Sequence, residues 1–285
     1  MKILTFNVEN LFLDPLFAYQ HKATLKEKNQ LERMCKILFE IDADILGLQE
    51  VGGKNSFQIL RDYLQKHYQI DYEIVTHPGN SDRGIEVGYL IKQHLTYNAT
   101  SHHQVQLDLT DQFSKEYKKI ARNFLQLTLL KDEKKFHFLL IHLKSARNLD
   151  SLDPGGVHKR KSEIRALLKL SKKLEQDAPV IILGDFNTPI EKTNNELLKL
   201  HESFFELCDY LELPEENRVT YIGRHRNQAP AHILLDTFFI SKNLKTLIDK
   251  RESGVYRPQK QSLKTLKRED FPSDHFPVLL KLMTS

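Results

Sequence analysis

Apolar and polar residues show two periodicities along the chain, one typical of strands and one typical of helices. In residues 2–8 they alternate, which predicts a half-buried β-strand. In residues 25–41 the apolar side chains recur at the spacing of one helix face, which predicts an amphipathic helix. Further apolar runs predict helices at 55–66 and 157–174 and strands at 44–49, 72–76, 85–91, 96–107, 123–130, 135–142, 179–183, 234–240 and 277–282.

The order of these elements indicates a fold class. Strands and helices alternate at first, strands then dominate, and the pattern repeats with a long helix at 157–174. Two strand-rich halves with helices predict two β-sheets packed face to face and covered by helices, a four-layer α/β sandwich. The sequence has no Pro/Gly/Ser-rich linker and no internal repeat, so we expect one domain over residues 1–285.

Composition narrows the class of protein. Hydrophobic residues make up 40% and charged residues 28% of the 285, which excludes disorder. No apolar run approaches the ~20 residues of a membrane-spanning helix. Two cysteines cannot form a disulfide framework or a four-cysteine zinc site. The sequence starts directly in a predicted strand, so we expect a cytoplasmic protein, or a secreted one if a presequence was removed.

Positive charge is concentrated in two segments, although the net charge is only +4. Basic residues cluster in 158–173 and in 251–268. Each segment is either a solvated surface or a surface that receives a polyanion.

Polar residues at the ends of apolar strands carry the candidate chemistry. At a strand end a side chain leaves the core and can meet a ligand at the sheet edge. The residues in such places are Asn7, Glu50, His142, Lys144, Asp185, Asn187, Asp274 and His275, and Asp236 lies within an apolar run. Singly, Asn7 would be read as a cap, His142 as a structural histidine, and Asp185 with Asn187 as an Asx turn.

Together these motifs resemble the endonuclease/exonuclease/phosphatase superfamily, the fold of deoxyribonuclease I. The resemblance runs from Phe6-Asn7 to Ser273–Val278, and its most specific parts are 48–50, 184–187 and 273–275. The runs 83–89 and 142–145 are most similar to bacterial nuclease branches. The resemblance implies a four-layer sandwich and metal-dependent hydrolysis of phosphoesters.

The resemblance also implies a metal site. Glu50 is expected to be the main metal ligand, with Asp274 and Asn7 close by. Carboxylate and amide oxygens suit Mg²⁺, with Mn²⁺ as an alternative.

The other roles follow from the same resemblance. His275 is similar to the family's catalytic histidine and Asp236 to its orienting partner, while Asp185 would hold or activate the attacking water. Asn187 would bind a phosphate oxygen, and which of His275 and Asp185 takes the water's proton stays open. His142 resembles a second histidine that pairs with an acid, for which Glu86 is the candidate. Arg122 and Lys144 are expected to contact substrate phosphate, unless Arg122 is only a surface charge.

Three functions are open at this point. The leading hypothesis is a Mg²⁺-dependent, monomeric phosphodiesterase that cuts nucleic acid, with DNA favoured over RNA. A phosphatase or phosphodiesterase acting on a lipid head group or a small phosphoester is the alternative, because fold does not fix function. A non-catalytic binding protein is disfavoured, because every expected catalytic position is filled.

Overall fold

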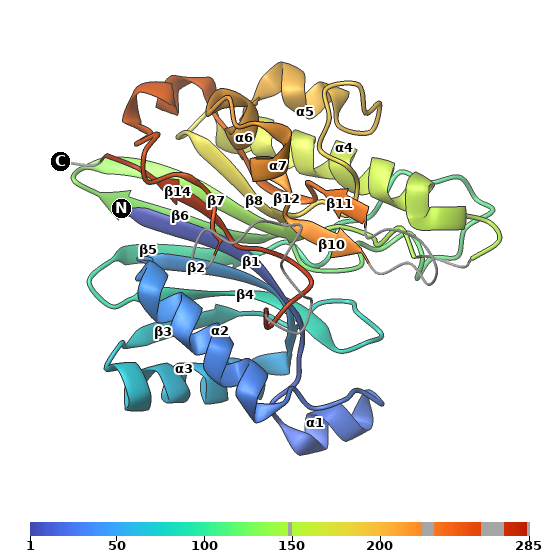
Figure 1. Ribbon diagram of the computed structural model, residues 1–285. Coiled ribbons are helices and arrows are strands. Elements are labelled where there is room, and N and C mark those ends of the chain that lie inside the picture. The colour runs from blue at the N-terminus through green and yellow to red at the C-terminus, as the bar shows by residue number, and fades with distance from the viewer. Residues whose placement is uncertain (148–149, 224–230, 258–270, 284–285) are drawn as a thin grey trace.

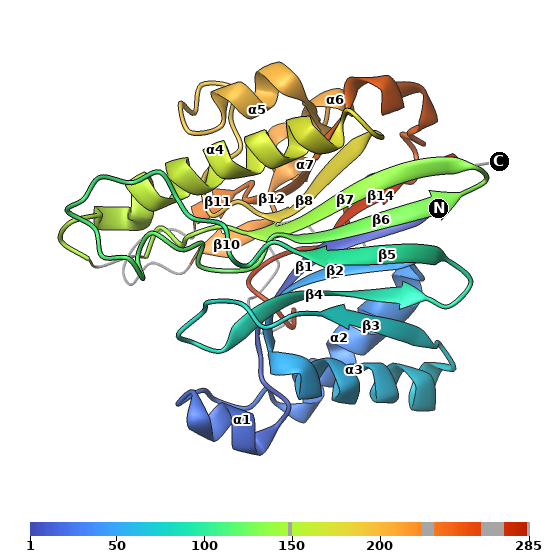
Figure 2. The same cartoon turned by 180° about the vertical axis from the view of Figure 1, so that it is seen from behind.

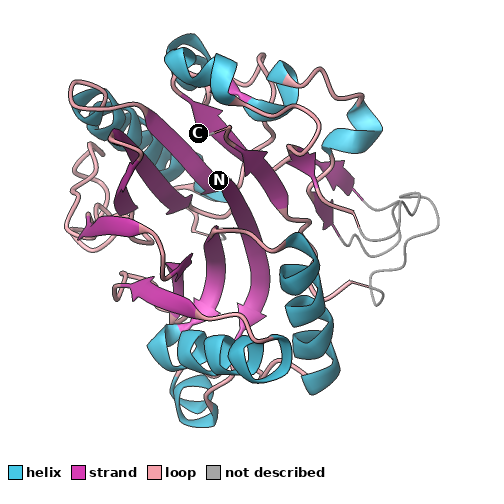
Figure 3. Cartoon of the chain, turned by 90° about the vertical axis from the view of Figure 1, so that its left-hand side faces the viewer, coloured by secondary structure: helices cyan, strands magenta, loops and turns pink. Residues whose placement is uncertain are grey.

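The computed structural model describes residues 1–147, 150–223, 231–257 and 271–283. Two six-stranded sheets face each other in the middle of the molecule and helices cover both outer faces, so the predicted four-layer sandwich is confirmed (Figure 1). Turned to one side, the molecule shows its strands between helices at the top and bottom (Figure 3). Among the described residues, no helix is long and apolar enough to cross a membrane.

The first sheet has the order β13-β14-β1-β2-β4-β3. Its strands are β1 (Lys2–Leu11), β2 (Ile45–Gly52), β3 (Tyr72–Thr76), β4 (Ile85–Lys92), β13 (Gly254–Val255) and β14 (Val278–Lys281). The parallel strands β1 and β2 are joined through α2 (Lys28–Ile41), and α3 (Gly53–Tyr68) follows β2. Such a crossover places its helix on a face of the sheet, and both helices lie below it in Figure 1.

The second sheet has the order β5-β6-β7-β8-β12-β9. Its strands are β5 (Thr96–Ser101), β6 (Leu125–Lys131), β7 (Lys134–His142), β8 (Val180–Asp185), β9 (Phe205–Glu206) and β12 (Asp236–Ile240). The parallel strands β7 and β8 are joined through α4 (Val157–Leu174), which covers the outer face of this sheet (Figure 2).

Short elements complete the described chain. They are α1 (Pro15–Gln20), α5 (Leu198–Ser203), α6 (Leu207–Tyr210), α7 (Glu215–Arg218), the hairpin of β10 (Tyr221–Gly223) and β11 (Ala231–Ile233), and 3₁₀ turns at Pro154–Gly156 and Lys242–Leu247. The strand predicted at 96–107 is shorter than expected, because its pairing with β6 ends where Ser101 meets Leu125.

Three apolar layers hold the sandwich together. Between the sheets, side chains such as Ile45 and Val87 pack with Leu140 and Leu183. One outer layer joins the first sheet to α2 and α3, and the other joins the second sheet to α4. Burial of about 25 cal/mol per Å² of apolar surface makes these layers the main source of stability.

Candidate active site

Three strands of the second sheet end at the same level and bring three polar side chains together. Asp185 at the end of β8 is in register with His142 of parallel β7 and with Asp236 of antiparallel β12. All three side chains are buried. The strand pairing alone therefore builds a row of two carboxyl groups and an imidazole.

The first sheet contributes Asn7 from β1 and Glu50 from β2. Asn7 Nδ2 donates a hydrogen bond to Asp185 Oδ2 at 3.0 Å, which connects the two sheets at the site. Glu50 is the extra residue where β2 shifts register against β4, and its φ is 64°. A bulge next to an active site re-aims a side chain, here that of Glu50.

His275 enters the site from the segment before β14. Ser273 Oγ donates to the Asn7 carbonyl at 2.7 Å and accepts from the His275 N–H at 3.1 Å, which fixes this turn against β1. His275 Nδ1 lies 2.7 Å from Asp236 Oδ2. One imidazole nitrogen of His275 and one carboxylate oxygen each of Asp236 and Asp185 all lie within 4.8 Å of one another.

Burial and the charge of Asp236 shift the pKa of His275 in opposite directions. Burial alone would lower the pKa of His275, but the charge and hydrogen bond of Asp236 outweigh it and raise that pKa to about 10. Burial, with the charge of Asp236, raises the pKa of Asp185 to about 7. Burial also raises the pKa of Asp236, and the charge and hydrogen bond of His275 oppose that shift. At neutral pH the imidazole therefore keeps its proton.

Asn187 and Asp185 do form an Asx-type turn, as the simpler interpretation of their spacing allowed. The Asn187 N–H donates to Asp185 Oδ1 at 2.7 Å, and Asn187 Nδ2 donates to the Leu143 carbonyl at 3.0 Å. Asn187 has a φ of 53°. Both side chains nevertheless line the same cavity, so the turn also presents them to a ligand.

The cavity above this cluster has a volume of about 560 Å³. Carboxylates of Glu50 and Asp274 lie at its wall together with His275. Its cationic residues are Arg83, Arg122, Lys144 and Arg147. A cavity with both signs of charge suits an anionic ligand held together with a cation.

Glu50 and Asp274 fit a divalent cation. Both face the cavity, and among the described residues neither makes an ion pair with a lysine or arginine. Burial lowers the pKa of the nearby Lys26 to about 8, and the charges of Asp274 and Glu50 oppose this shift. Oxygen donors without a thiolate match a hard ion such as Mg²⁺, since both cysteines are buried outside this cavity.

Asn7 is less directly available as a metal ligand. Its Oδ1 accepts from the Glu9 N–H at 3.0 Å and its Nδ2 is bound to Asp185. In this structure Asn7 positions Asp185, and its role as a ligand stays a prediction.

His142 does not pair with Glu86. Its Nε2 lies 3.6 Å from Asp185 and 3.8 Å from Glu50, whereas Glu86 accepts a hydrogen bond from Thr76 at 3.2 Å. Burial lowers the pKa of His142 well below its ordinary value, so this ring is neutral.

Arg122 and Lys144 both reach the cavity wall. Arg122 is buried, donates to the Leu143 carbonyl at 3.3 Å, and has a buried Nε without a partner. The alternative of an exposed surface charge is therefore wrong for Arg122. The Lys144 N–H is fixed by Glu163 Oε2 at 2.7 Å.

Sequence reasoning missed other residues of the cavity wall. They include Glu9, Asn10 and Arg147. Arg147 Nη2 bonds to the Tyr221 hydroxyl at 2.5 Å, and the Tyr221 ring lies 4.9 Å from that of His275. Glu9 and Asn10 lie two and three residues after Asn7 and both have positive φ, so only their proximity to the first motif could have indicated them.

The structure describes most of the first basic segment but only part of the second. In α4, Lys159 and Arg160 are buried, and Arg160 pairs with Glu196 at 2.8 Å, while Lys169, Lys172 and Lys173 are exposed. Of the second segment, residues 258–268 lie outside the described residues.

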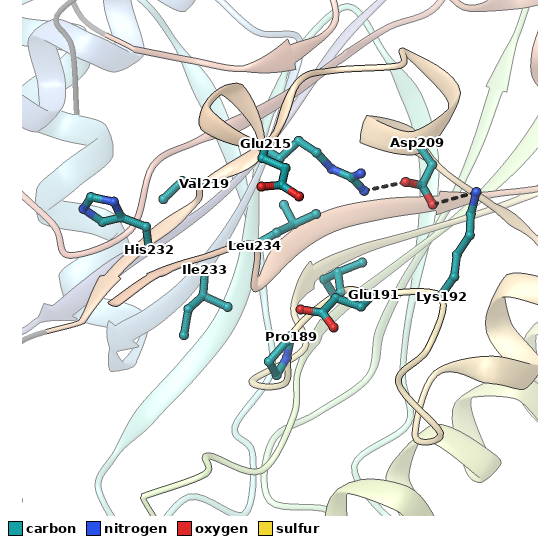
Figure 4. A pocket seen from close by; sticks show the side chains of 11 residues that line it. Pro189, Glu191, Lys192, Asp209, Glu215, Val219, His232, Ile233 and Leu234 are labelled. Atoms are coloured by element: carbon teal, nitrogen blue, oxygen red, sulfur yellow. Dashed lines mark hydrogen bonds and ion pairs between the residues drawn. The ribbon is translucent and has the colours of Figure 1, made fainter. Parts of the chain in front are cut away.

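A further cavity of about 730 Å³ adjoins the catalytic one, and both are lined by Pro189 and Ile233 (Figure 4). Three of its charged groups pair with one another, because Asp209 lies 2.5 Å from Arg218 and 3.6 Å from Lys192. This cavity therefore enlarges the space beside the candidate active site, and its pairing charges suggest no catalytic role.

The sequence profile of the Endonuclease/Exonuclease/phosphatase family matches residues 4–275, so the chain belongs to this family. Members of the family hydrolyse phosphoester bonds, and the protein is a phosphoester hydrolase. A search of curated protein sequences found no match.

Solved structures share the fold at low sequence identity. D. rerio TDP2 complexed with a single-strand DNA product superposes with a TM-score of 0.68 at 18% identity, covering 100% of this chain and 99% of that one. The human Nocturnin catalytic domain with bound sulfate gives 0.65 at 17%, covering 98% and 93%. A family protein from Leptotrichia buccalis gives 0.64 at 18%, covering 99% of each chain.

Proposed function

We propose that the protein is a Mg²⁺-dependent phosphodiesterase that cuts nucleic acid, with DNA favoured over RNA and Mn²⁺ as a substitute ion. The observation that carries this proposal is the hydrogen-bonded His275–Asp236 pair beside Asp185, at the base of a cavity with both carboxylates and basic residues. The single-strand DNA product bound to the similar fish protein supports a nucleic-acid substrate.

The protein's own residues divide the chemistry among them. Asp185, whose pKa is about 7, accepts a proton from the attacking water at neutral pH. His275 holds its proton through Asp236, so its Nε2–H donates to a phosphate oxygen. Asn187, Arg122 and Lys144 bind the remaining phosphate oxygens. A divalent cation held by Glu50 and Asp274 would neutralise the phosphate and the leaving oxygen.

A substrate panel tests the proposal. Supercoiled plasmid, linear duplex, single-stranded DNA, RNA, bis(p-nitrophenyl) phosphate and an inositol monoester are each incubated with Mg²⁺, Mn²⁺ or EDTA. We expect nucleic acid to be cut with Mg²⁺, cutting to stop with EDTA, and cutting to return when Mg²⁺ is restored.

The variant Glu50→Gln tests whether Glu50 binds the metal ion. The variant should require at least tenfold more Mg²⁺ for half-maximal cutting, because a ligand charge is lost. Glu73→Gln, an exposed glutamate on β3, is the matched control and should need the wild-type concentration. Full activity after exhaustive chelation would exclude the metal, and hydrolysis of the monoester alone would favour the small-phosphoester function.

A further inference from the structure

A second cavity opens beside the catalytic one. Its volume is about 630 Å³, and it shares Arg83, Arg122 and Lys144 with the catalytic cavity. The rest of its wall comes from the segments 79–82 and 114–121 and from Lys159 at the start of α4. The two cavities therefore lie side by side and share part of their wall.

Lys159 is the unusual residue of this cavity. It is only 6% exposed, and among the described residues it makes no ion pair with a carboxylate. Its Nζ lies 4.5 Å from the centroid of the Tyr117 ring. Burial lowers its pKa, although Glu163 opposes the shift. Its side chain is buried, but its Nζ is not among the fully buried polar atoms without a partner in the described residues, so the ammonium is open to the cavity and can bind an anion there.

The Tyr117 ring is held in place and is not free to stack on a nucleobase. Its hydroxyl donates to Asp153 Oδ2 at 2.8 Å, and Phe113 stacks on it at 5.2 Å with an interplanar angle of 15°. Lys144 Nζ also lies 5.9 Å from its centroid. The ring thus positions two ammonium groups toward one space.

The charge of the cavity favours an anion over a cation. Its acidic residues are Asp82 and Glu116, against five basic ones: Arg83, Lys119, Arg122, Lys144 and Lys159. Arg122 adds a buried Nε that has no partner in the protein. Phosphate oxygens are the acceptors that arginine and lysine groups in such a cavity recognise.

We propose that this cavity is a flanking-phosphate pocket, in which Lys159 binds the phosphate next to the scissile one in a nucleic-acid strand, while Arg122 and Lys144, which line both cavities, lie between the two phosphates. The inference rests on the proposed function, because it assigns a second phosphate to the substrate of the same site. It distinguishes a strand from a small ester, which has no second phosphate to fill the pocket.

Thymidine 3′,5′-bisphosphate is a suitable probe, because it carries two phosphates and no diester bond to cut. Its dissociation constant is measured by calorimetry in Mg²⁺ and compared with those of thymidine 5′-monophosphate and 3′-monophosphate. We expect the bisphosphate to bind at least tenfold more tightly than either monophosphate, as a hydrogen bond to a charged group predicts.

Lys159→Met removes the charge and keeps the length of the side chain. In this variant the preference for the bisphosphate should fall to within twofold of the monophosphates. Lys169→Met is the matched control: it removes the same charge from an exposed position of α4 that does not line the pocket, and should keep the preference. A urea midpoint at or above the wild-type value for Lys159→Met would establish that the variant folds.

Three results would overturn the pocket: no preference in the wild type, an unchanged preference in Lys159→Met, or an equal loss in Lys169→Met. The proposed function fails separately, through the substrate panel. A Lys159-dependent preference in a protein that cuts no nucleic acid would support the pocket and reject the nucleic-acid substrate.

Discussion

At the scale of single residues, the Asp236 carboxylate determines which nitrogen of His275 faces the cavity. The 2.7 Å bond to Nδ1 leaves Nε2 as the nitrogen available to substrate. Asp236→Asn removes the charge that keeps the imidazole protonated. We expect kcat to fall by about 10²–10⁴, the usual contribution of a general acid–base group, with KM changed less than threefold.

The pair of exposed Asp177 and buried His137 provides the control for this measurement. Asp177 lies 3.0 Å from His137 Nε2, and His137 pairs with Val180 at the start of β8, whereas His142 pairs with Asp185 at the end of β8. Asp177→Asn should leave steady-state kinetics on bis(p-nitrophenyl) phosphate unchanged. A wild-type kcat in Asp236→Asn would mean that the His275–Asp236 pair is not used in turnover.

His201 provides a pH test that is independent of catalysis. Its ring packs edge-on against Phe239 at 5.0 Å, its Nε2 is buried without a partner, and burial lowers its pKa. The unfolded histidine takes up a proton near its ordinary pKa of about 6.5, and the folded one only at lower pH. The stability from this neutral ring is therefore complete above that pH and is lost as pH falls below it.

His201→Phe should flatten this dependence. Urea midpoints are measured from pH 8 to pH 5, and the wild type should lose more stability than the variant over this range. Other histidines titrate equally in both proteins, so they cancel in the comparison. Parallel pH profiles would show that the His201 proton is not linked to folding.

At the scale of elements, β8 depends on a glycine directly before Asp185, the base of the proposed mechanism. Gly184 has a φ of 140°, and a Cβ there would lie 2.0 Å from the Ile141 carbonyl of β7. Gly254 has nearly the same φ, 137°, but its Cβ would meet nothing closer than 3.7 Å. An alanine at either position is strained by the positive φ, but only an alanine at Gly184 also clashes with a neighbouring strand. Comparing the two substitutions therefore separates the cost of the clash from the cost of the backbone strain.

Gly254→Ala should lower the free energy of unfolding by about 1–3 kcal/mol, the cost of an unfavourable φ. Gly184→Ala should cost distinctly more, because the backbone of β7 must move, and it should also reduce activity through Asp185. Urea unfolding of both variants measures the difference. Equal losses would mean that β7 yields to the added methyl group without cost.

Long elements could be predicted from their periodicity, and short ones could not. The helix predicted at 157–174 and the strand predicted at 72–76 match α4 and β3 in both bounds. The helices α5 to α7 and strands β9 to β11 have at most six residues each, too few for a hydrophobic period to emerge. The strand β5 ends at Ser101 because its pairing with β6 ends there, and no sequence pattern indicates this limit.

At the scale of the whole molecule, the site lies where the two sheets meet. The sequence motifs predict which polar side chains gather, because strand ends share a sheet edge. They do not predict the bond from Asn7 to Asp185, which joins residues 178 apart, nor the preference of His142 for Asp185 and Glu50 over Glu86. Those contacts depend on how the sheets dock, which is decided by side-chain packing such as that of Gly47 against Leu140 and Leu183.

The pairing of β1 with β14 affects the order in which the enzyme is completed during its synthesis. Ser273 binds the backbone of Asn7 across 266 residues, and β14 fills the place between β1 and β13. While a ribosome is still translating the segment before Ser273, β1 has an unpaired edge and the turn that carries His275 does not yet exist. With the role proposed for His275, a nascent chain therefore cannot hydrolyse its substrate, however much of the second sheet has already formed.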